Sequence, residues 1–187
     1  MKRSLLILLY LIPLPFKVAT SNSEISIIED NIDTPILEVM DLDDILLDSC
    51  INHLKSYEGF REHIYKDNDG TPTIGYGHHI SKEEVFETSI TEQEATKILI
   101  KDFKKKLKWV NKNHKLEKNK SYAIALFCFN IGEGKFRRST LRKLILKDEP
   151  IESEIVKWKW FRHKGNLKEN KKLKERRLFE LNMYTNE

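Results

Sequence analysis

The segment of residues 58–78 constrains the fold more than any other part of this 187-residue chain. It reads EGFREHIYKDNDGTPTIGYGH, with an Asp-Gly pair between two short stretches, the second of which is rich in β-branched and aromatic residues. Asp-Gly at a strand junction favours a tight turn, because glycine accepts positive φ. The sequence therefore predicts a hairpin whose second strand, residues 71–77, folds back on the first and brings Thr73 near Asp67.

A helix is predicted immediately before this hairpin. Within residues 44–58 the apolar residues recur at spacings of four and three, as on one face of a helix: Leu47, Ile51 and Leu54. Gly59 can supply the left-handed cap that ends this helix. The end of the predicted helix therefore carries the carboxylate of Glu58, and the hairpin carries that of Asp67.

Two carboxylates in different environments suit the cleavage of a glycosidic bond. One can keep a proton for the leaving oxygen, while the other serves a water molecule or the sugar carbon in its ionised form. The alternative is that Glu58 is a helix-end charge and Asp67 an ordinary turn residue, since acid pairs are common beside turns. Spacing alone favours this alternative, and only the wider pattern of motifs reverses that preference.

Three stretches of the chain resemble one known family. The motifs Glu-Gly-Phe-Arg, Tyr-Lys-Asp and Thr-Ile-Gly-Tyr-Gly-His within residues 58–78 resemble, without gaps, the catalytic segment of the phage-type lysozymes (muramidases and endolysins of glycoside hydrolase family 24). Residues 129–141, FNIGEGKFRRSTL, are similar to the second signature of that family. Residues 172–180 match its closing motif Gly-Leu-x-x-Arg-Arg-x-x-Glu, except that Lys172 replaces the glycine. The resemblance covers about residues 47–183.

The resemblance implies an α+β fold of two lobes, in which a long helix joins a small hairpin-bearing lobe to a mostly helical lobe. It implies hydrolysis of the β-1,4 bond between N-acetylmuramic acid and N-acetylglucosamine in peptidoglycan, without a cofactor. Glu58 would be the general acid, with a raised pKa, Asp67 the ionised partner, and Thr73 the residue that holds the attacking water. The family is associated with inversion, which requires carboxyl groups roughly 6.5–9.5 Å apart. The alternative function is a non-catalytic wall-binding protein, which would be expected to have lost one of these three residues.

Other candidate residues also follow from the resemblance. Asn130 would bind substrate, since the polar residue at this helix end lines the family's cleft, although Asn130 can equally be read as a helix cap. Arg176 or Arg177 is expected to approach Glu58, and His78 to hold the small lobe together by pairing with an acid. The adjacent His79 suggests a metal site, but neighbouring strand residues point to opposite faces and no third ligand stands at a suitable spacing. No metal is therefore predicted.

The N-terminal region divides into two predicted parts before the catalytic domain of residues 44–187. Residues 1–21 combine a basic start, a short apolar run and small residues, which predicts a cleaved signal peptide for export to the periplasm or the medium; an uncleaved signal anchor is the alternative. The run is too short for a comfortable membrane span, so no stable membrane insertion is expected after cleavage. Residues 22–43 are acidic and contain no Lys or Arg, as in a linker, or they dock on the basic cleft and damp activity.

The net charge of +4 is unevenly distributed, because the acidic linker precedes a strongly basic remainder. A basic domain fits a polyanionic cell envelope, and charge alone does not separate this from nucleic acid. No element that reads nucleic acid is recognisable, so bacterial peptidoglycan is the expected partner of a monomeric protein. Cys50 and Cys128 are expected to be free thiols rather than a disulfide, because Cys128 falls in a wholly apolar helix and reads as a small core residue.

Further elements are predicted from periodicity and capping signals. Thr91 and Glu94 form a capping box that starts the long connecting helix. Residues 78–80 are expected to close the second strand of the hairpin. The remaining predictions are a buried helix at residues 122–129 with Ser121 as a possible cap, a helix capped by Ser139 or Thr140, an amphipathic helix at 151–161, a turn at 163–166 and a last helix at 167–184.

Overall fold

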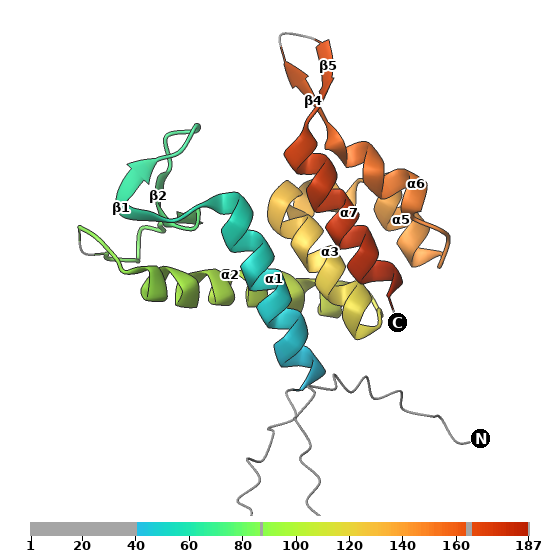
Figure 1. The fold of residues 1–187 in the computed structure, drawn as a ribbon, viewed down its shortest axis with the longest axis horizontal. Coiled ribbons are helices and arrows are strands. Elements are labelled where there is room, and N and C mark those ends of the chain that lie inside the picture. The colour runs from blue at the N-terminus through green and yellow to red at the C-terminus, as the bar shows by residue number, and fades with distance from the viewer. Residues whose placement is uncertain (1–40, 87, 164–165, 187) are drawn as a thin grey trace, which may run out of the picture. The chain divides into compact units, whose positions relative to one another are not determined.

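The computed structural model describes residues 41–86, 88–163 and 166–186 (Figure 1). The predicted signal peptide and nearly all of the predicted acidic linker lie outside these residues. None of the described helices is long and apolar enough to cross a lipid bilayer.

Helix α1 (Leu42–Glu58) begins two residues before the predicted start of the domain. Its first turn already contacts the helical lobe, because Oδ2 of Asp43 lies 2.7 Å from Nζ of Lys118. The predicted apolar face is shifted by one position: Leu47 is only partly buried, whereas Leu46 and Cys50 join Ile51 and Leu54 in the core. Gly59 ends the helix at a positive φ of +71°, as predicted, but its ψ of 142° lies outside the left-handed helical region.

The small lobe contains an antiparallel sheet of β1 (Arg61–Lys66), β2 (Pro72–Gly75) and β3 (His78–His79), in that order. Gly70 takes φ +80° in the predicted hairpin turn. The prediction that residues 78–80 close the second strand was wrong. Gly75 and Gly77 both have positive φ, which turns the chain and folds His78–His79 back on β2 as a third strand.

Helix α2 (Glu92–Asn113) links the two lobes and starts at the predicted capping box. Oγ1 of Thr91 accepts a hydrogen bond from the Glu94 backbone N–H, and the Glu94 side chain accepts one from the Thr91 N–H. Figure 1 shows α2 passing below the sheet and behind α1 towards the helical lobe. The helix buries Ala95, Leu99, Phe103 and Val110 on one face.

Helix α3 (Lys118–Ile131) lies at the centre of the helical lobe (Figure 1). Every residue from 121 to 128 is buried, which confirms the prediction of a helix buried on all sides. Ser121 is not its cap. The helix begins three residues earlier, and the Ser121 N–H donates to the Glu117 carbonyl within the first turn. The short helices α4 (Glu133–Arg137) and α5 (Thr140–Leu146) follow, and Ser139 caps α5 by accepting from the Arg142 N–H.

The region after residue 155 departs from the predicted helix. Helix α6 (Glu152–Ile155) and the 3₁₀ turn η1 (Val156–Lys159) lead into an antiparallel hairpin of β4 (Trp160–His163) and β5 (Asn166–Glu169). The helix was predicted from the helical spacing of Ile155, Trp158 and Phe161 alone, whereas aromatic residues also favour strands. Helix α7 (Lys171–Thr185) therefore starts four residues later than predicted, with the Asn170 side chain accepting from the Leu173 N–H.

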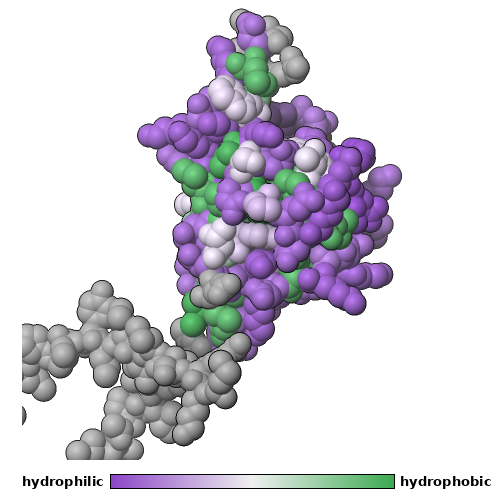
Figure 2. Space-filling model, turned by 90° about the vertical axis from the view of Figure 1, so that its right-hand side faces the viewer, coloured by the Kyte–Doolittle hydropathy of each residue, from purple (hydrophilic) through white to green (hydrophobic). Residues whose placement is uncertain are grey.

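The hairpin carries exposed apolar side chains, with Phe161 39% and Leu167 58% exposed. Figure 2 shows this apolar surface at the top of a face that is otherwise mostly hydrophilic. Both cysteines are buried and free, as predicted, and Sγ of Cys50 lies 3.8 Å from Sδ of Met183.

Candidate active site

Glu58 is the last residue of α1, and the buried Arg176 of α7 holds it. Nη1 of Arg176 donates to Oε1 of Glu58 at 3.0 Å. The Arg176 side chain is 7% exposed and that of Glu58 is 27% exposed, so one edge of the carboxyl group contacts a buried cation while the group still reaches solvent. Of the two arginines that were candidates for this contact, the structure selects Arg176.

Asp67 lies at the start of the turn between β1 and β2, and three donors or potential donors surround its carboxyl group. Oδ1 accepts from the backbone N–H groups of Asp69 and Thr71, both at 2.9 Å. Oδ2 lies 3.1 Å from Nε2 of His79. The sequence predicts no role for His79, which reaches Asp67 because the third strand pairs with β2. The turn therefore fixes the orientation of the carboxyl group.

Thr73 lies beneath this turn rather than on its surface. The residue is 1% exposed, and its hydroxyl donates to the Thr71 carbonyl at 3.0 Å. The strand register pairs it with Tyr65 on one side and His79 on the other. A threonine hydroxyl that donates one hydrogen bond can in general also accept one. The role of holding the attacking water stays a prediction.

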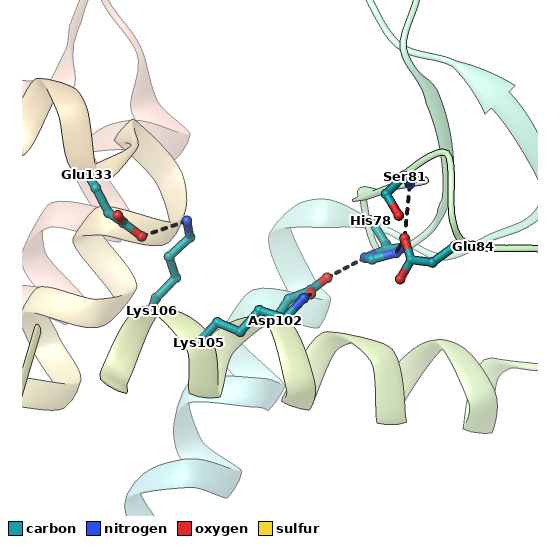
Figure 3. A network of polar contacts seen from close by, with 7 residues as sticks. All are labelled: His78, Ser81, Glu84, Asp102, Lys105, Lys106 and Glu133. Carbon is teal, nitrogen blue, oxygen red and sulfur yellow. Dashed lines mark hydrogen bonds and ion pairs between the residues drawn. The ribbon is translucent and has the colours of Figure 1, made fainter. Parts of the chain in front are cut away.

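His78 connects the small lobe to α2 through a network of polar contacts (Figure 3). Nδ1 lies 2.6 Å from Oδ2 of Asp102, and Nε2 lies 3.2 Å from Oε2 of Glu84. The Ser81 N–H donates to Glu84 at 2.9 Å. Hydrogen bonds from Ser81, with His78 adding to the effect, lower the pKa of Glu84 to about 2. The acidic partner expected for His78 is thus present, and the contact with Asp102 connects β3 to the helix α2.

A cavity of about 460 Å³ opens between the two lobes, and residues of β3, α2 and the end of α3 line it. Its wall includes His79, the neighbour of Asp67, and Phe129, which precedes Asn130. Nζ of Lys106 on α2 lies 3.0 Å from Oε1 of Glu133 on α4, as Figure 3 shows. Glu58, Asp67, Thr73 and Asn130 do not themselves line this cavity, which adjoins the candidate site through His79, the contact of Asp67, and through Phe129.

Asn130 is the second-last residue of α3 and is partly exposed. It does not cap the helix, because Gly132 occupies the cap position at φ +82° and donates to the Cys128 carbonyl. Nη2 of Arg177 donates to Oδ1 of Asn130 at 3.1 Å and to Oε1 of Glu180 at 2.7 Å. Arg177 thus supports the predicted binding residue, while Arg176 supports the predicted acid.

Metal ligation finds no support in the part of the chain that is described. Within residues 41–86, 88–163 and 166–186, no group of three or more His, Cys, Asp or Glu side chains is arranged to hold a metal ion.

Comparison with known proteins agrees with this architecture. The phage lysozyme family matches residues 55–180, and the chain therefore belongs to this family. The endolysin of Bacillus phage PZA is 30% identical over 139 residues, which cover 69% of this chain and 52% of the endolysin. The chain thus spans about half the length of that relative.

Two further similarities cover most of the matching protein. The endolysin of Salmonella phage P22 is 33% identical over 120 residues, which cover 58% of this chain and 80% of the endolysin. Among solved structures, the muramidase domain of SpmX from Asticaccaulis excentricus superimposes with a TM-score of 0.65 at 24% identity, covering 74% of this chain and 96% of that domain. The predicted α+β lysozyme fold is confirmed.

Proposed function

We propose that this protein is a peptidoglycan hydrolase of the lysozyme type, which cleaves the β-1,4 bond between N-acetylmuramic acid and N-acetylglucosamine. Membership of the phage lysozyme family and the similarity to two phage endolysins support this proposal. The observation that carries it is the contact of Arg176 with Glu58. A buried arginine 118 residues further along the chain holds a carboxyl group that lies at a helix end and still reaches solvent.

In the proposed mechanism Glu58 donates its proton to the glycosidic oxygen as the bond to the anomeric carbon breaks. Arg176, whose Nη1 lies 3.0 Å from Oε1, then stabilises the resulting carboxylate through a charge-assisted hydrogen bond. This bond is stronger to the carboxylate than to the acid, so it favours the transition state over the ground state.

Asp67, in its ionised form, stabilises the oxocarbenium-like state and takes a proton from the attacking water. The water adds to the anomeric carbon on the face opposite the leaving oxygen, which inverts the configuration. Contacts from Asp69, Thr71 and His79 hold the carboxylate in place for this step. Thr73 would accept a hydrogen bond from the water.

Export through residues 1–21 forms part of the same proposal, because peptidoglycan lies outside the cytoplasmic membrane. The proposed partner is the bacterial cell wall, and the proposed working form is the monomer.

Zymography on purified cell walls tests the proposed function. Wild-type protein should clear a band, and Glu58→Gln should lower turnover by about 10⁴-fold, at the upper end for the loss of one acid–base group. Glu62→Gln is the matched control, since Glu62 is an exposed residue of β1 with the same side chain. A Glu58→Gln protein within tenfold of wild type would exclude the assignment of the acid. A protein that binds walls without clearing them would establish the non-catalytic alternative.

A further inference from the structure

Two consecutive arginines of α7 serve different sides of the candidate site. Arg176 donates to Glu58 at 3.0 Å, whereas Arg177 donates to Asn130 at 3.1 Å. Arg177 also donates to Glu180, one turn further along the same helix, at 2.7 Å. The Arg177 and Glu180 side chains are 0% and 1% exposed, so their ion pair lies entirely inside the protein.

The stability of the fold does not explain this buried pair. Nε and Nη1 of Arg177 and Oε2 of Glu180 are buried and make no hydrogen bond within the described residues. Apolar side chains of similar volume often replace a buried ion pair without loss of stability, whereas removal of one partner alone is strongly destabilising. The face of the Arg177 guanidinium packs 4.6 Å from the Phe127 ring centroid, so the surroundings are suited to an apolar side chain.

The contact with Arg177 determines how the Asn130 amide is oriented. An arginine side chain has donors and no acceptor, so the amide oxygen of Asn130 must face Arg177. The amide NH₂ group then points away from Arg177 and remains a donor. Asn130 is partly exposed and directly follows Phe129, which lines the cavity between the lobes.

We propose that Glu180 is a positioning residue for substrate binding: it fixes Arg177, which turns the Asn130 amide so that its NH₂ group is offered to a hydrogen-bond acceptor of the glycan. The proposal rests on the proposed function, because the glycan is the substrate assigned there. Suitable acceptors are the N-acetyl carbonyl and hydroxyl oxygens of the sugars.

The electrostatic surroundings agree with an obligatory pair. Burial raises the pKa of Glu180, and Arg177 and Arg176 oppose this shift. Burial lowers the pKa of Arg177, and Glu180 opposes that shift in turn. Burial thus disfavours the charge on each residue, and the partner offsets part of that penalty.

The two arginines are therefore expected to control different kinetic constants. Arg176 touches the proposed acid and should affect kcat. Arg177, anchored by Glu180, should affect KM for the glycan and leave kcat nearly unchanged. A role limited to stability would change neither constant in protein that is folded.

The test replaces the pair by apolar residues, in the double variant Arg177→Met with Glu180→Leu, which avoids leaving an unpaired buried charge. On soluble, uncrosslinked glycan strands, KM should rise about tenfold, as expected for a lost hydrogen bond that leaves an unpaired group. The value of kcat should stay within about twofold, because uniform binding alone is lost. Glu180→Gln leaves the Arg177 charge unpaired and should lower stability, but it keeps an acceptor for Arg177, so the folded variant should have a KM within about twofold of wild type.

The matched control is the double variant Glu154→Leu with Lys157→Met. This ion pair has the same i,i+3 spacing and the same 2.7 Å separation, but its lysine is 65% exposed. Its KM should equal that of wild type. In an Asn130→Ala background the Arg177→Met/Glu180→Leu change should have no further effect on KM, since coupled residues are not additive.

A folded Arg177→Met/Glu180→Leu protein with wild-type KM would overturn the inference, as would a rise in KM that persists in full without Asn130. Failure of the proposed function gives a different result. If wild-type protein hydrolyses nothing, the dissociation constant of the same strands, measured by calorimetry, replaces KM. The inference would be overturned if the Arg177→Met/Glu180→Leu change left this constant unaltered, or if wild-type protein did not bind the strands at all. A dissociation constant raised about tenfold, as for KM, would support it.

Discussion

The two carboxyl groups of the site are held in contrasting ways. Asp67 accepts from backbone groups two and four residues ahead and contacts His79 of β3, so all of these partners belong to the sheet of the small lobe. Glu58 and Asn130 depend on partners 118 and 47 residues away, which reach them only because α7 packs in the helical lobe. The hairpin side should therefore depend on local backbone conformation, whereas the helical side should depend on long-range packing and buried charge.

Asp67→Asn provides the sharpest test on the hairpin side and has the largest expected effect of the changes in the small lobe. Asparagine keeps an oxygen that can accept from Asp69 and Thr71, so the turn should survive. Loss of the charge should lower turnover on soluble glycan strands by about 10²–10⁴-fold. Asp69→Asn, which changes an exposed acid in the same turn, is the control and should retain full activity. An Asp67→Asn protein with more than a tenth of wild-type turnover would show that the turn holds no catalytic group.

Gly75→Ala tests how strongly the small lobe depends on backbone conformation. An added Cβ would lie 3.1 Å from Cβ of Ala95 and 3.3 Å from Cδ1 of Ile90, at φ +64°. Overpacking and the left-handed conformation together should lower the free energy of unfolding by about 3 kcal/mol. Gly70→Ala has φ +80° but no atom within 4 Å, so it should lose only about 1 kcal/mol. Equal urea midpoints for the two variants would contradict the close packing of β2 on α2.

Asp102→Asn tests the connection between the lobes. It weakens the 2.6 Å contact with His78, and we expect a loss of about 1–2 kcal/mol in the free energy of unfolding. Lys105→Met removes only the contact of a lysine that is 58% exposed with the same aspartate, and it should change stability by less than about 0.5 kcal/mol. If both variants unfold at the same denaturant concentration, His78 does not anchor the small lobe.

The pH dependence of stability that His53 causes is the smallest expected effect, and it tests the influence of the buried charges in the helical lobe. Its ring stacks on Phe179 at 3.8 Å, and burial, with Arg176 and Arg177 adding to it, lowers the pKa of His53 to about 4. The unfolded chain takes up this proton near pH 6.5 and the folded chain only near pH 4. The stability contributed by the neutral ring is therefore complete above pH 6.5 and is lost as the pH falls towards 4.

Between pH 7 and pH 5 wild-type protein should lose about 1 kcal/mol more stability than His53→Gln, a figure that allows for partial solvent exposure of the ring. Urea denaturation at the two pH values measures this difference. Parallel losses in both proteins would show that burial and the neighbouring arginines do not lower the pKa of His53.

The same contrast decides how much the sequence could predict. The capping box of Thr91 and Glu94 and the positive φ of Gly70 depend on neighbours in the chain, and both are present as predicted. The choice between Arg176 and Arg177 could not be made, because both positions fit the motif and only the packing of α7 separates them. Glu180 was seen only as a motif residue, since no local pattern reveals a buried charge.

Two other misses have local causes. The β4–β5 hairpin was read as helix, because the spacing of three residues favoured a helix over the strand preference of Trp160 and Phe161. The third strand depends on the combined effect of the positive φ at Gly75 and Gly77 on chain direction, which no single motif signals, and the contact of His79 with Asp67 depends on the same turn. The burial of Thr73 follows from the same strand pairing.

Identification of the products released from purified peptidoglycan tests the central claim most directly. Cleavage by an acid from α1 and a water activated by Asp67 should yield fragments that end in reducing N-acetylmuramic acid, and borohydride should convert this sugar to its alditol. New reducing ends on N-acetylglucosamine, fragments closed as an internal anhydro ring, or release of peptide amino groups alone would each contradict the assignment.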